Sequence, residues 1–139
     1  MKYSFELKTD VAIEKIWSFY EDVNKWFLWE DDLEDISLNG PFSMNTKGTM
    51  KLAGQPSMEF LLVSVIPGKI FTDKTSIPNI GDIYFIHELS EKDNQTFIKH
   101  SVEFIPINRT SNSKDLKFIS QIFADVPASV FSLVKVANE

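Results

Sequence analysis

The stretch Ile83–Phe104, IYFIHELSEKDNQTFIKHSVEF, predicts the sheet on which the rest of the fold depends. Two runs of alternating apolar residues flank Asp93-Asn94, a dipeptide that can fill the two positive-φ positions of a type I′ turn. That turn places His87 opposite His100 on one face of a hairpin. A four-residue turn would make them diagonal neighbours on the same face. These are the only two histidines in the chain.

One face of this hairpin is apolar apart from the histidines, as expected for strands that cover a core on one side. We expect it to be the concave face of a curved sheet. Its members are Ile83, Phe85, His87, Leu89, Ile98, His100, Val102 and Phe104.

The N-terminal part of the chain predicts one strand followed by two short helices. Residues 2–8 alternate polar and apolar side chains, which is typical of a half-buried strand. From Ile13 to about Asp22, apolar residues recur with helical spacing. Trp26 and Trp29 then lie on one side of a short second helix or turn, where they either pack in the core or gate a pocket mouth.

Further strands are predicted before the hairpin. Residues 35–53 fit two strands joined by a turn-rich connection. Residues 58–66 are apolar at both odd and even positions, as in a strand covered on both faces. Pro67-Gly68 supplies a turn into residues 69–76. If that turn pairs residue 66 with residue 69, one face carries Phe60, Leu62, Ser64 and Phe71.

The C-terminal segment, residues 112–138, has the apolar spacing of a helix long enough to cross a sheet. Pro127 interrupts it, because proline lacks a backbone donor and clashes with the preceding turn. We expect a kink near Ala124 or a break capped by Asp125. The order of elements predicts a single α+β domain, residues 1–139. It is a helix-grip fold with a curved six- to seven-stranded antiparallel sheet around a long C-terminal helix.

Composition excludes several chemistries. The chain has no cysteine, hence no disulfide, thiolate nucleophile or cysteine-bound metal. The N-terminus does not look like a signal peptide, and no apolar run approaches the ~20 residues of a membrane span. We therefore expect a cytoplasmic protein. Twelve Phe residues are more aromatic bulk than a domain of 139 residues needs, so some should line a cavity.

Charge is concentrated in residues 21–35, which carry the whole net charge of −6. The chain has only one arginine, Arg109, and no basic stripe, which argues against nucleic-acid binding. The acidic segment is either a solvated face or a docking site for a cation, a basic protein or a second copy of the chain.

Several segments together resemble the polyketide cyclase/dehydrase and lipid-transport group of the START-like (Bet v1-like, SRPBCC) superfamily. The resemblance covers nearly the full chain and is carried by FELKTDVAIEKIWSFYEDVNKWFLW, ISLNGPFSMNTKGTM, VIPGKIFT, FIHEL, TFIKHSVEF and DVPASVFSLVKVANE. It implies a deep apolar pocket between the sheet and the C-terminal helix, which receives a lipid, a polyketide or another hydrophobic molecule.

The residues expected to line that pocket are large apolar side chains with a few polar groups. They are Trp26, Trp29, Phe60, Phe71, Phe85, His87, His100, Val102, Phe104 and Phe123. The histidines are interpreted as buried hydrogen-bonded residues, as ligand contacts or as general acids and bases. No metal or cofactor site is expected. Two histidines are too few for zinc, Asp73 is the only acidic residue near them, and no pair of carboxylates is expected on the concave face.

Three functions follow as hypotheses. The first is non-catalytic binding of a small hydrophobic ligand, which the aromatic concave face favours. The second is a cyclase or dehydratase that uses His87 or His100 as acid or base. The third is a protein-interaction module that uses the acidic face of residues 21–35.

Overall fold

The computed structural model describes all residues from Met1 to Glu139 and confirms the helix-grip fold. Seven antiparallel strands form one sheet in the order β1-β7-β6-β5-β4-β3-β2. Along the chain the elements are β1 (Lys2–Thr9), α1 (Ile13–Glu21), the 3-10 helix η1 (Val23–Leu28), β2 (Leu33–Leu38), β3 (Lys47–Leu52), β4 (Met58–Ile66), β5 (Ile70–Ile77), β6 (Gly81–Lys92), β7 (Gln95–Pro106), α2 (Asp115–Phe123) and α3 (Val126–Ala137).

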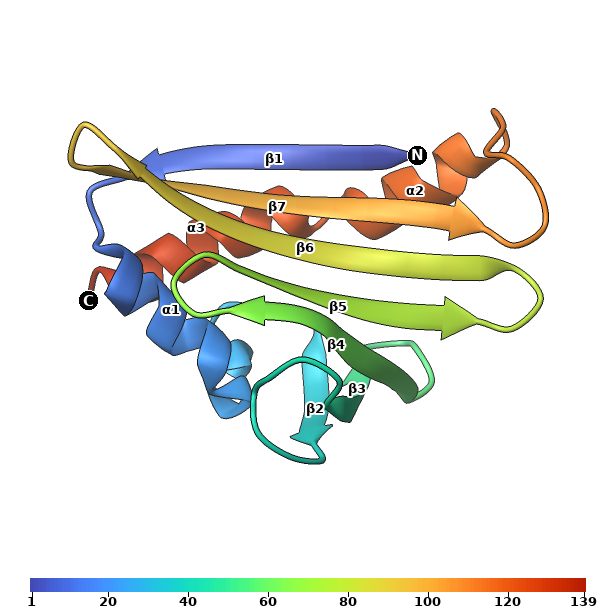
Figure 1. Ribbon diagram of the computed structural model, residues 1–139, viewed down its shortest axis with the longest axis horizontal. Coiled ribbons are helices and arrows are strands. Elements are labelled where there is room, and N and C mark those ends of the chain that lie inside the picture. The colour runs from blue at the N-terminus through green and yellow to red at the C-terminus, as the bar shows by residue number, and fades with distance from the viewer.

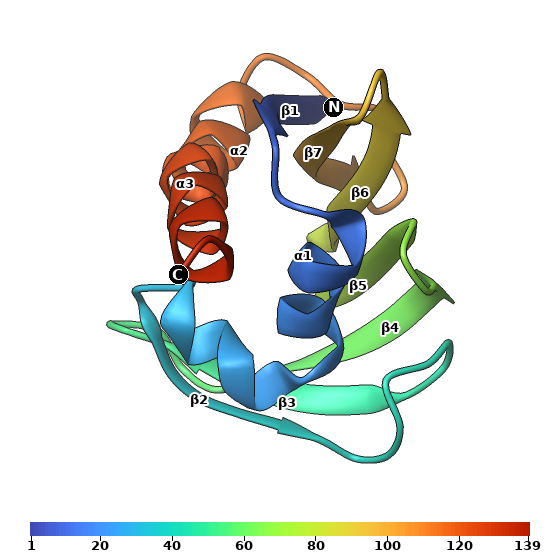
Figure 2. The same cartoon turned by 90° about the vertical axis from the view of Figure 1, so that its left-hand side faces the viewer.

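The sheet is strongly curved, and the two C-terminal helices lie along its concave side (Figures 1 and 2). Seen end-on, the strands bend around α3 while α1 and η1 close one end (Figure 2). Only a curved sheet lets one helix pair cover this many strands, because α1 and η1 together are too short to do so. The described architecture therefore leaves one shared interior between the sheet and the helices.

The β6–β7 hairpin has the predicted register. Asp93 and Asn94 have φ values of 54° and 63°, as a type I′ turn requires. The turn pairs Lys92 with Gln95, and His87 lies opposite His100. The hairpin was predictable because the turn and the alternation of side chains specify the same register.

The predicted pairing of β4 with β5 is wrong by one residue. Ile66 pairs with Ile70 instead of residue 69, and a bulge between Leu62 and Ser64 then shifts the alternation along β4. Phe60, Leu62 and Phe71 lie in the core as predicted, and Ser64 does not. Val65 takes the place of Ser64 opposite Phe71 and packs against the core.

The C-terminal helix is broken between α2 and α3, as Pro127 predicted. Pro127 lies in the first turn of α3, where its missing N–H leaves no helical hydrogen bond unmade. Asp125 occupies the N-cap position of α3 as predicted, but its side chain makes no capping hydrogen bond. Only its backbone oxygen takes part, accepting from the Ser129 N–H at 3.1 Å.

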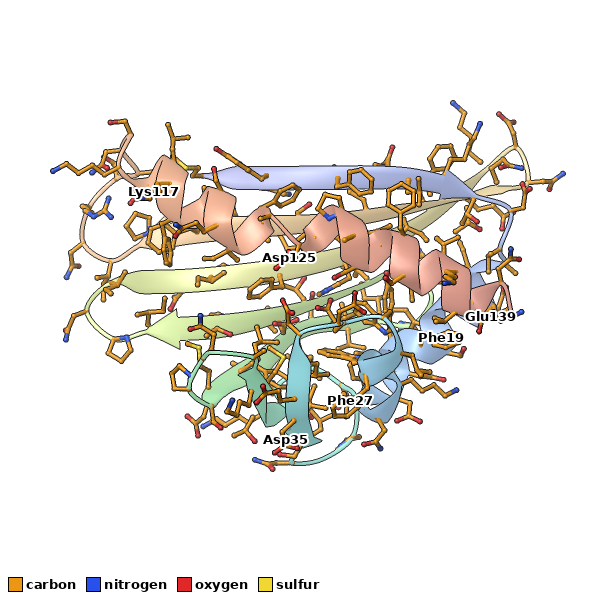
Figure 3. All side chains as sticks on the ribbon, turned by 180° about the vertical axis from the view of Figure 1, so that it is seen from behind. Phe19, Phe27, Asp35, Lys117, Asp125 and Glu139 are labelled. Carbon is orange, nitrogen blue, oxygen red and sulfur yellow. The ribbon has the colours of Figure 1, made fainter.

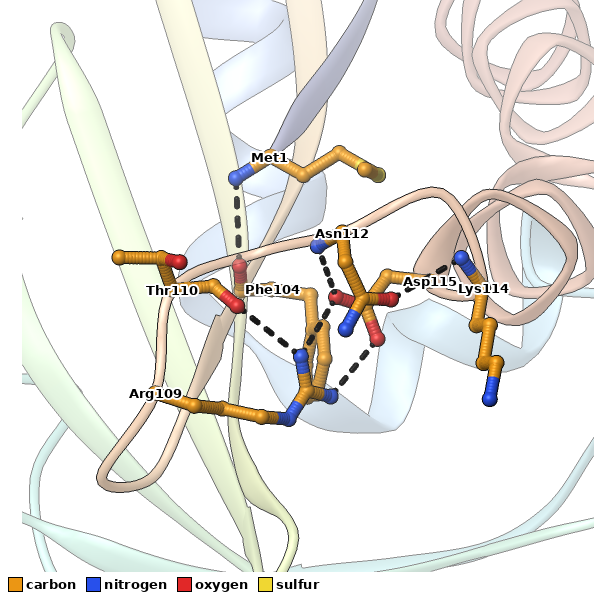
Figure 4. Close-up of polar contacts among 7 residues, drawn as sticks. All are labelled: Met1, Phe104, Arg109, Thr110, Asn112, Lys114 and Asp115. Carbon is orange, nitrogen blue, oxygen red and sulfur yellow. Dashed lines mark hydrogen bonds and ion pairs between the residues drawn. The ribbon is translucent and has the colours of Figure 1, made fainter.

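The start of α2 is held by the only arginine in the chain (Figure 4). Arg109 donates two hydrogen bonds to the Asp115 carboxylate, at 2.8 and 3.0 Å, and the Asn112 backbone N–H donates a third at 2.9 Å. These contacts lower the pKa of Asp115 to about 2. The helix begins at Asp115, three residues after the predicted start.

Taken together, residues Asp115–Ala137 are long and apolar enough, by length and composition, to cross a membrane. No such segment is predicted from the sequence. Only 17% of the most apolar window of this segment is buried inside the protein, and Ile119, Val130 and Leu133 are among its fully buried residues.

The interior contains two apolar clusters. The larger one joins α1, η1 and α3 to the sheet and contains Trp17, Tyr20, Trp26, Trp29, Phe60, Leu62, Phe71, Val130 and Leu133 among others. The smaller one lies under α2 and contains Ile83, Val102, Phe104 and Ile119.

Candidate functional site

The two histidines lie in the larger aromatic region and are fully engaged. His100 Nε2 is 2.6 Å from the Tyr20 hydroxyl, and His87 Nδ1 is 3.2 Å from the Phe71 carbonyl oxygen, to which it donates. The His87 ring stacks on Phe71 with 3.9 Å between ring centroids. Tyr20 and Trp29 pack against both imidazoles.

Burial makes both imidazoles neutral near pH 7. Burial lowers the pKa of His87 to about 3, and burial together with the neighbouring His87 lowers the pKa of His100 well below its ordinary value. Burial, assisted by the charge of Glu30, raises the pKa of Tyr20, so the hydroxyl keeps its proton and can donate it to His100. This arrangement is a satisfied polar network within the core.

The tryptophans also form part of the core. The Trp26 indole N–H donates to the Tyr20 carbonyl oxygen at 2.8 Å, and the Trp29 indole N–H donates to the Phe19 carbonyl oxygen at 3.1 Å. Their exposed fractions are 4% and 1%, so of the two predicted roles they have the core-packing one. The predicted lining residues thus divide: Trp26, Trp29, Phe60 and Phe71 belong to the larger cluster, and Phe85, Val102, Phe104 and Phe123 to the smaller one.

Two hollows open on the outside of the protein, and neither is lined by α2 or α3. The first, of about 500 Å³, lies over β3, β4 and β5 and is bordered by Lys47, Glu59, Phe60 and Lys74 among others. The second lies at the β5–β6 turn and the end of β7. Phe60 is the one predicted lining residue that borders either of them.

Phe85 marks a different kind of position on the concave face. It lies on the central strand β6, opposite Asp73 on β5 and Val102 on β7. Its neighbours along the same face, Ile83 and His87, are buried, but Phe85 is only partly so. Phe123 and Val126, which pack against the same cluster from the helices, are also only partly buried. Phe85, Phe123 and Val126 are thus the partly exposed apolar side chains on this side of the smaller cluster.

Two carboxylates lie in the interior, although none was expected there as a pair. Asp73 shares the concave face of β5 with Phe71 and is 4% exposed. Glu30 enters from the loop after η1, is half-buried, and accepts a hydrogen bond from the Ser129 hydroxyl of α3. The ion pairs of the protein are Lys51–Glu34 and Arg109–Asp115, so neither Glu30 nor Asp73 has a basic partner.

Both carboxyls hold their protons more tightly than usual. Burial, followed by the charge of Glu30, raises the pKa of Asp73 to about 8. Burial, followed by the charges of Asp32, Asp31 and Asp125, raises the pKa of Glu30 to about 7, against the Ser129 hydrogen bond. Near neutral pH the pair therefore carries at least part of a proton, and it can donate one, accept one or receive a cation. No group of three or more potential metal ligands is present.

The sequence contained a signal for one member of this pair. Asp73 lies two residues after Phe71 and so on the same inward face of β5, and the sequence identifies it only as a neighbour of the histidines. The sequence groups Glu30 with the acidic face of residues 21–35. Its position directly after the buried Trp29 is what turns it inward, because the backbone N–H of Glu30 donates to the Trp26 carbonyl oxygen at 2.8 Å.

No family profile and no curated protein matches the chain by sequence. Solved structures do match it. They include the Zhui aromatase/cyclase from Streptomyces sp. R1128 (TM-score 0.76, 10% identity, 99% of this chain and 93% of that one). They also include Ara h 8.0201 (TM-score 0.72, 12% identity, 99% and 98%) and norcoclaurine synthase from Thalictrum flavum (TM-score 0.72, 12% identity, 100% and 87%). These are Bet v1-like (SRPBCC) proteins, and the chain has their helix-grip fold.

Proposed function

We propose that this protein binds a small hydrophobic molecule on the concave face, between the sheet and the α2–α3 pair. The observation that carries the proposal is Asp73, a carboxyl that is nearly fully buried, has no basic partner and lies where two apolar clusters meet. An ionisable group that is buried without an opposite charge destabilises a fold, so its presence between two apolar clusters favours a role in function.

The surroundings of Asp73 suit an apolar ligand with one polar group. Phe85, Phe123 and Val126 keep part of their surface in solvent, so a ligand can cover them without displacing packed core. Each Å² of apolar surface removed from water is worth roughly 25 cal/mol. The side chains of Asp73, Glu30 and Ser129 can orient the polar end. The histidine cluster then acts as the rigid wall behind this space.

Entry from the side of the helix break fits the same arrangement. Asp125 lies at the junction between α2 and α3, over the middle of the sheet (Figure 3). The charge of Asp125 acts on Glu30, which is itself half-buried.

Native mass spectrometry of freshly purified protein, followed by solvent extraction, tests this proposal. We expect a bound apolar molecule in a one-to-one ratio, or one-to-one binding and a raised melting temperature when apolar compounds are added. The control is Phe85→Asp, which places a charge on the proposed wall and should abolish binding. The proposal is wrong if the protein is empty and no apolar compound binds.

Catalysis is the second candidate, because two neighbouring carboxyls with raised pKa values suit proton transfer near neutral pH. A cyclase or dehydratase would then use Asp73 and Glu30 as acid and base. His87 and His100, the candidates that the sequence predicts for this role, are hydrogen-bonded to Phe71 and Tyr20. Turnover of a ketide-like substrate that survives Asp73→Asn and Glu30→Gln would exclude this assignment.

A protein-interaction role for the acidic face stays a prediction, as does the cytoplasmic location. Glu30 points inward, so that face consists of the exposed members of the segment: Glu21, Asp22, Asp31, Asp32, Glu34 and Asp35. Glu34 is paired with Lys51. Salt-sensitive association with a basic protein, measured at several ionic strengths, tests this role.

A further inference from the structure

We propose that the ligand carries a protonated amine, which binds between the carboxyl groups of Asp73 and Glu30 while its apolar part covers Phe85. This inference rests on the proposed binding function and names the class of ligand. It comes from the charges around the site and from the strand register that places Asp73 beside Phe85.

Every ionisable group that acts on this site is acidic. Asp31 and Asp32 of the loop after η1 and Asp125 of the helix break act on Glu30, and Glu30 acts on Asp73. The lysine nearest to Asp73 in sequence, Lys74, points to the opposite face of β5. An interior lined by one sign of charge concentrates ions of the opposite sign. The entrance therefore attracts cations and repels carboxylic acids.

The carboxyl of Asp73 provides the second, independent observation. It is 96% buried, counting from its exposed fraction of 4%, and no other side chain hydrogen-bonds to it. Its contact is with its own backbone N–H. A buried carboxyl whose one contact is a backbone N–H can still accept further hydrogen bonds, and a ligand can provide the donors. An ammonium group provides both three donors and the missing positive charge.

An organic amine fits the site better than a metal ion does. Calcium takes six to eight oxygen ligands and magnesium needs nearly ideal octahedral geometry, but this site offers only two carboxyls and one hydroxyl. Apolar surface surrounds them, with Phe85 opposite Asp73 in the register and Phe71 two residues away on the same strand. Aromatic rings also attract organic cations through their faces. The site thus combines a place for a cation with a place for an apolar group.

Binding of an ammonium should displace the proton that the carboxyl pair holds near neutral pH, since a nearby positive charge favours the ionised forms. The proton passes to the buffer, so the observed heat of binding depends on the ionisation enthalpy of the buffer. A neutral ligand leaves that proton in place. Proton release therefore distinguishes an amine held by the carboxyls from one held only by its apolar part.

Isothermal titration calorimetry with three matched probes tests the proposal: 4-phenylbutylamine, 4-phenyl-1-butanol and 4-phenylbutyrate. We expect the amine to bind about 10- to 100-fold more tightly than the alcohol, the range for a hydrogen bond to a charged group, and the acid to bind most weakly. Only the amine should release a proton. Asp73→Asn should remove the preference for the amine, and Glu30→Gln should reduce it. Glu91→Gln, which changes an exposed carboxylate on β6, is the matched control.

Two results overturn the amine proposal, and they are distinguishable. If the alcohol binds as tightly as the amine and Asp73→Asn changes neither, the apolar site exists and the assignment of an amine is wrong. If none of the three probes binds, the amine proposal also fails, and the native mass spectrum decides separately whether an apolar ligand is bound at all. Circular dichroism of each variant confirms that the fold is retained. Glu30→Gln is a milder substitution than Asp73→Asn, because Glu30 is only half-buried.

Discussion

The histidine pair and the carboxylate pair lie in the same interior, but their polar atoms are partnered differently. His87 and His100 are hydrogen-bonded to Phe71 and Tyr20 and enclosed by aromatic rings. Asp73 and Glu30 have no basic partner, and Phe85, which lies opposite Asp73, is only partly buried. Burying an ionisable group without an opposite charge is costly, so the carboxyl pair is the one whose presence requires an explanation beyond stability.

The two pairs also have opposite effects on stability as the pH changes. The pKa of His87 is lowered from 6.5 to about 3, so its neutral form supports the fold above pH 6.5 and this support is lost as the pH falls. The pKa of Asp73 is raised from 3.8 to about 8, so the folded protein binds the extra proton and loses stability as the pH rises through this range. The histidines therefore limit stability in acid and the carboxyls limit it in base.

Phe71→Ala should have the largest effect. The ring is fully buried and stacks on His87, so its removal should lower the free energy of unfolding by about 3–5 kcal/mol. Urea unfolding at neutral pH measures it. A loss below about 1 kcal/mol would mean that the histidine end is loosely packed, and the contrast with the carboxyl end would disappear.

Asp73→Asn should flatten the dependence of stability on pH. Between pH 4 and pH 8 the wild-type free energy of unfolding falls by up to about 1.4 kcal/mol per pH unit from this group, and asparagine cannot ionise. The variant should be the more stable protein at pH 8 and should have no advantage at pH 4. Urea unfolding at several pH values, with Glu91→Gln as the control, checks this. If the free energy of unfolding depends on pH in the same way in the variant and the wild type, the prediction is wrong.

Tyr20→Phe should destabilise the protein by about 1–3 kcal/mol, because it leaves His100 Nε2 buried without a partner. The matched control is Tyr84→Phe, since the Tyr84 hydroxyl makes no hydrogen bond to another residue and the side chain lies on the opposite face of β6. Thermal unfolding of both variants compares them. Equal melting temperatures would show that the histidine network is not satisfied in the way described.

Asp115→Asn should have the smallest effect, because the Arg109 side chain in this pair is 42% exposed. The pKa of Asp115 is lowered from 3.8 to about 2, so its contribution is complete above pH 4 and is lost as the pH falls toward 2. The variant should be slightly less stable than the wild type at pH 7 and should lose less on acidification. Melting temperatures at about pH 7 and about pH 3 test this, and a difference that grows in acid would contradict it.

Local patterns made most of the fold predictable. The hairpin followed from Asp93-Asn94, and the helix break followed from Pro127, because each residue type restricts the backbone by itself. The bulge in β4 could not be predicted, since a strand that is apolar on both faces gives no sign of where its alternation changes. The inward turn of Glu30 also depended on tertiary contacts, with Trp26 and Ser129, that no local pattern contains.

The most direct test of the account is the titration of the Asp73 carboxyl carbon by ¹³C NMR, assigned by comparison with Asp73→Asn. The account predicts that this carboxyl titrates near pH 8 in the free protein and that its pKa falls when 4-phenylbutylamine is added. A midpoint near the ordinary value of 3.8 would contradict it, because Asp73 would then be a solvated or paired carboxylate and not the buried carboxyl without a basic partner on which the proposed site depends.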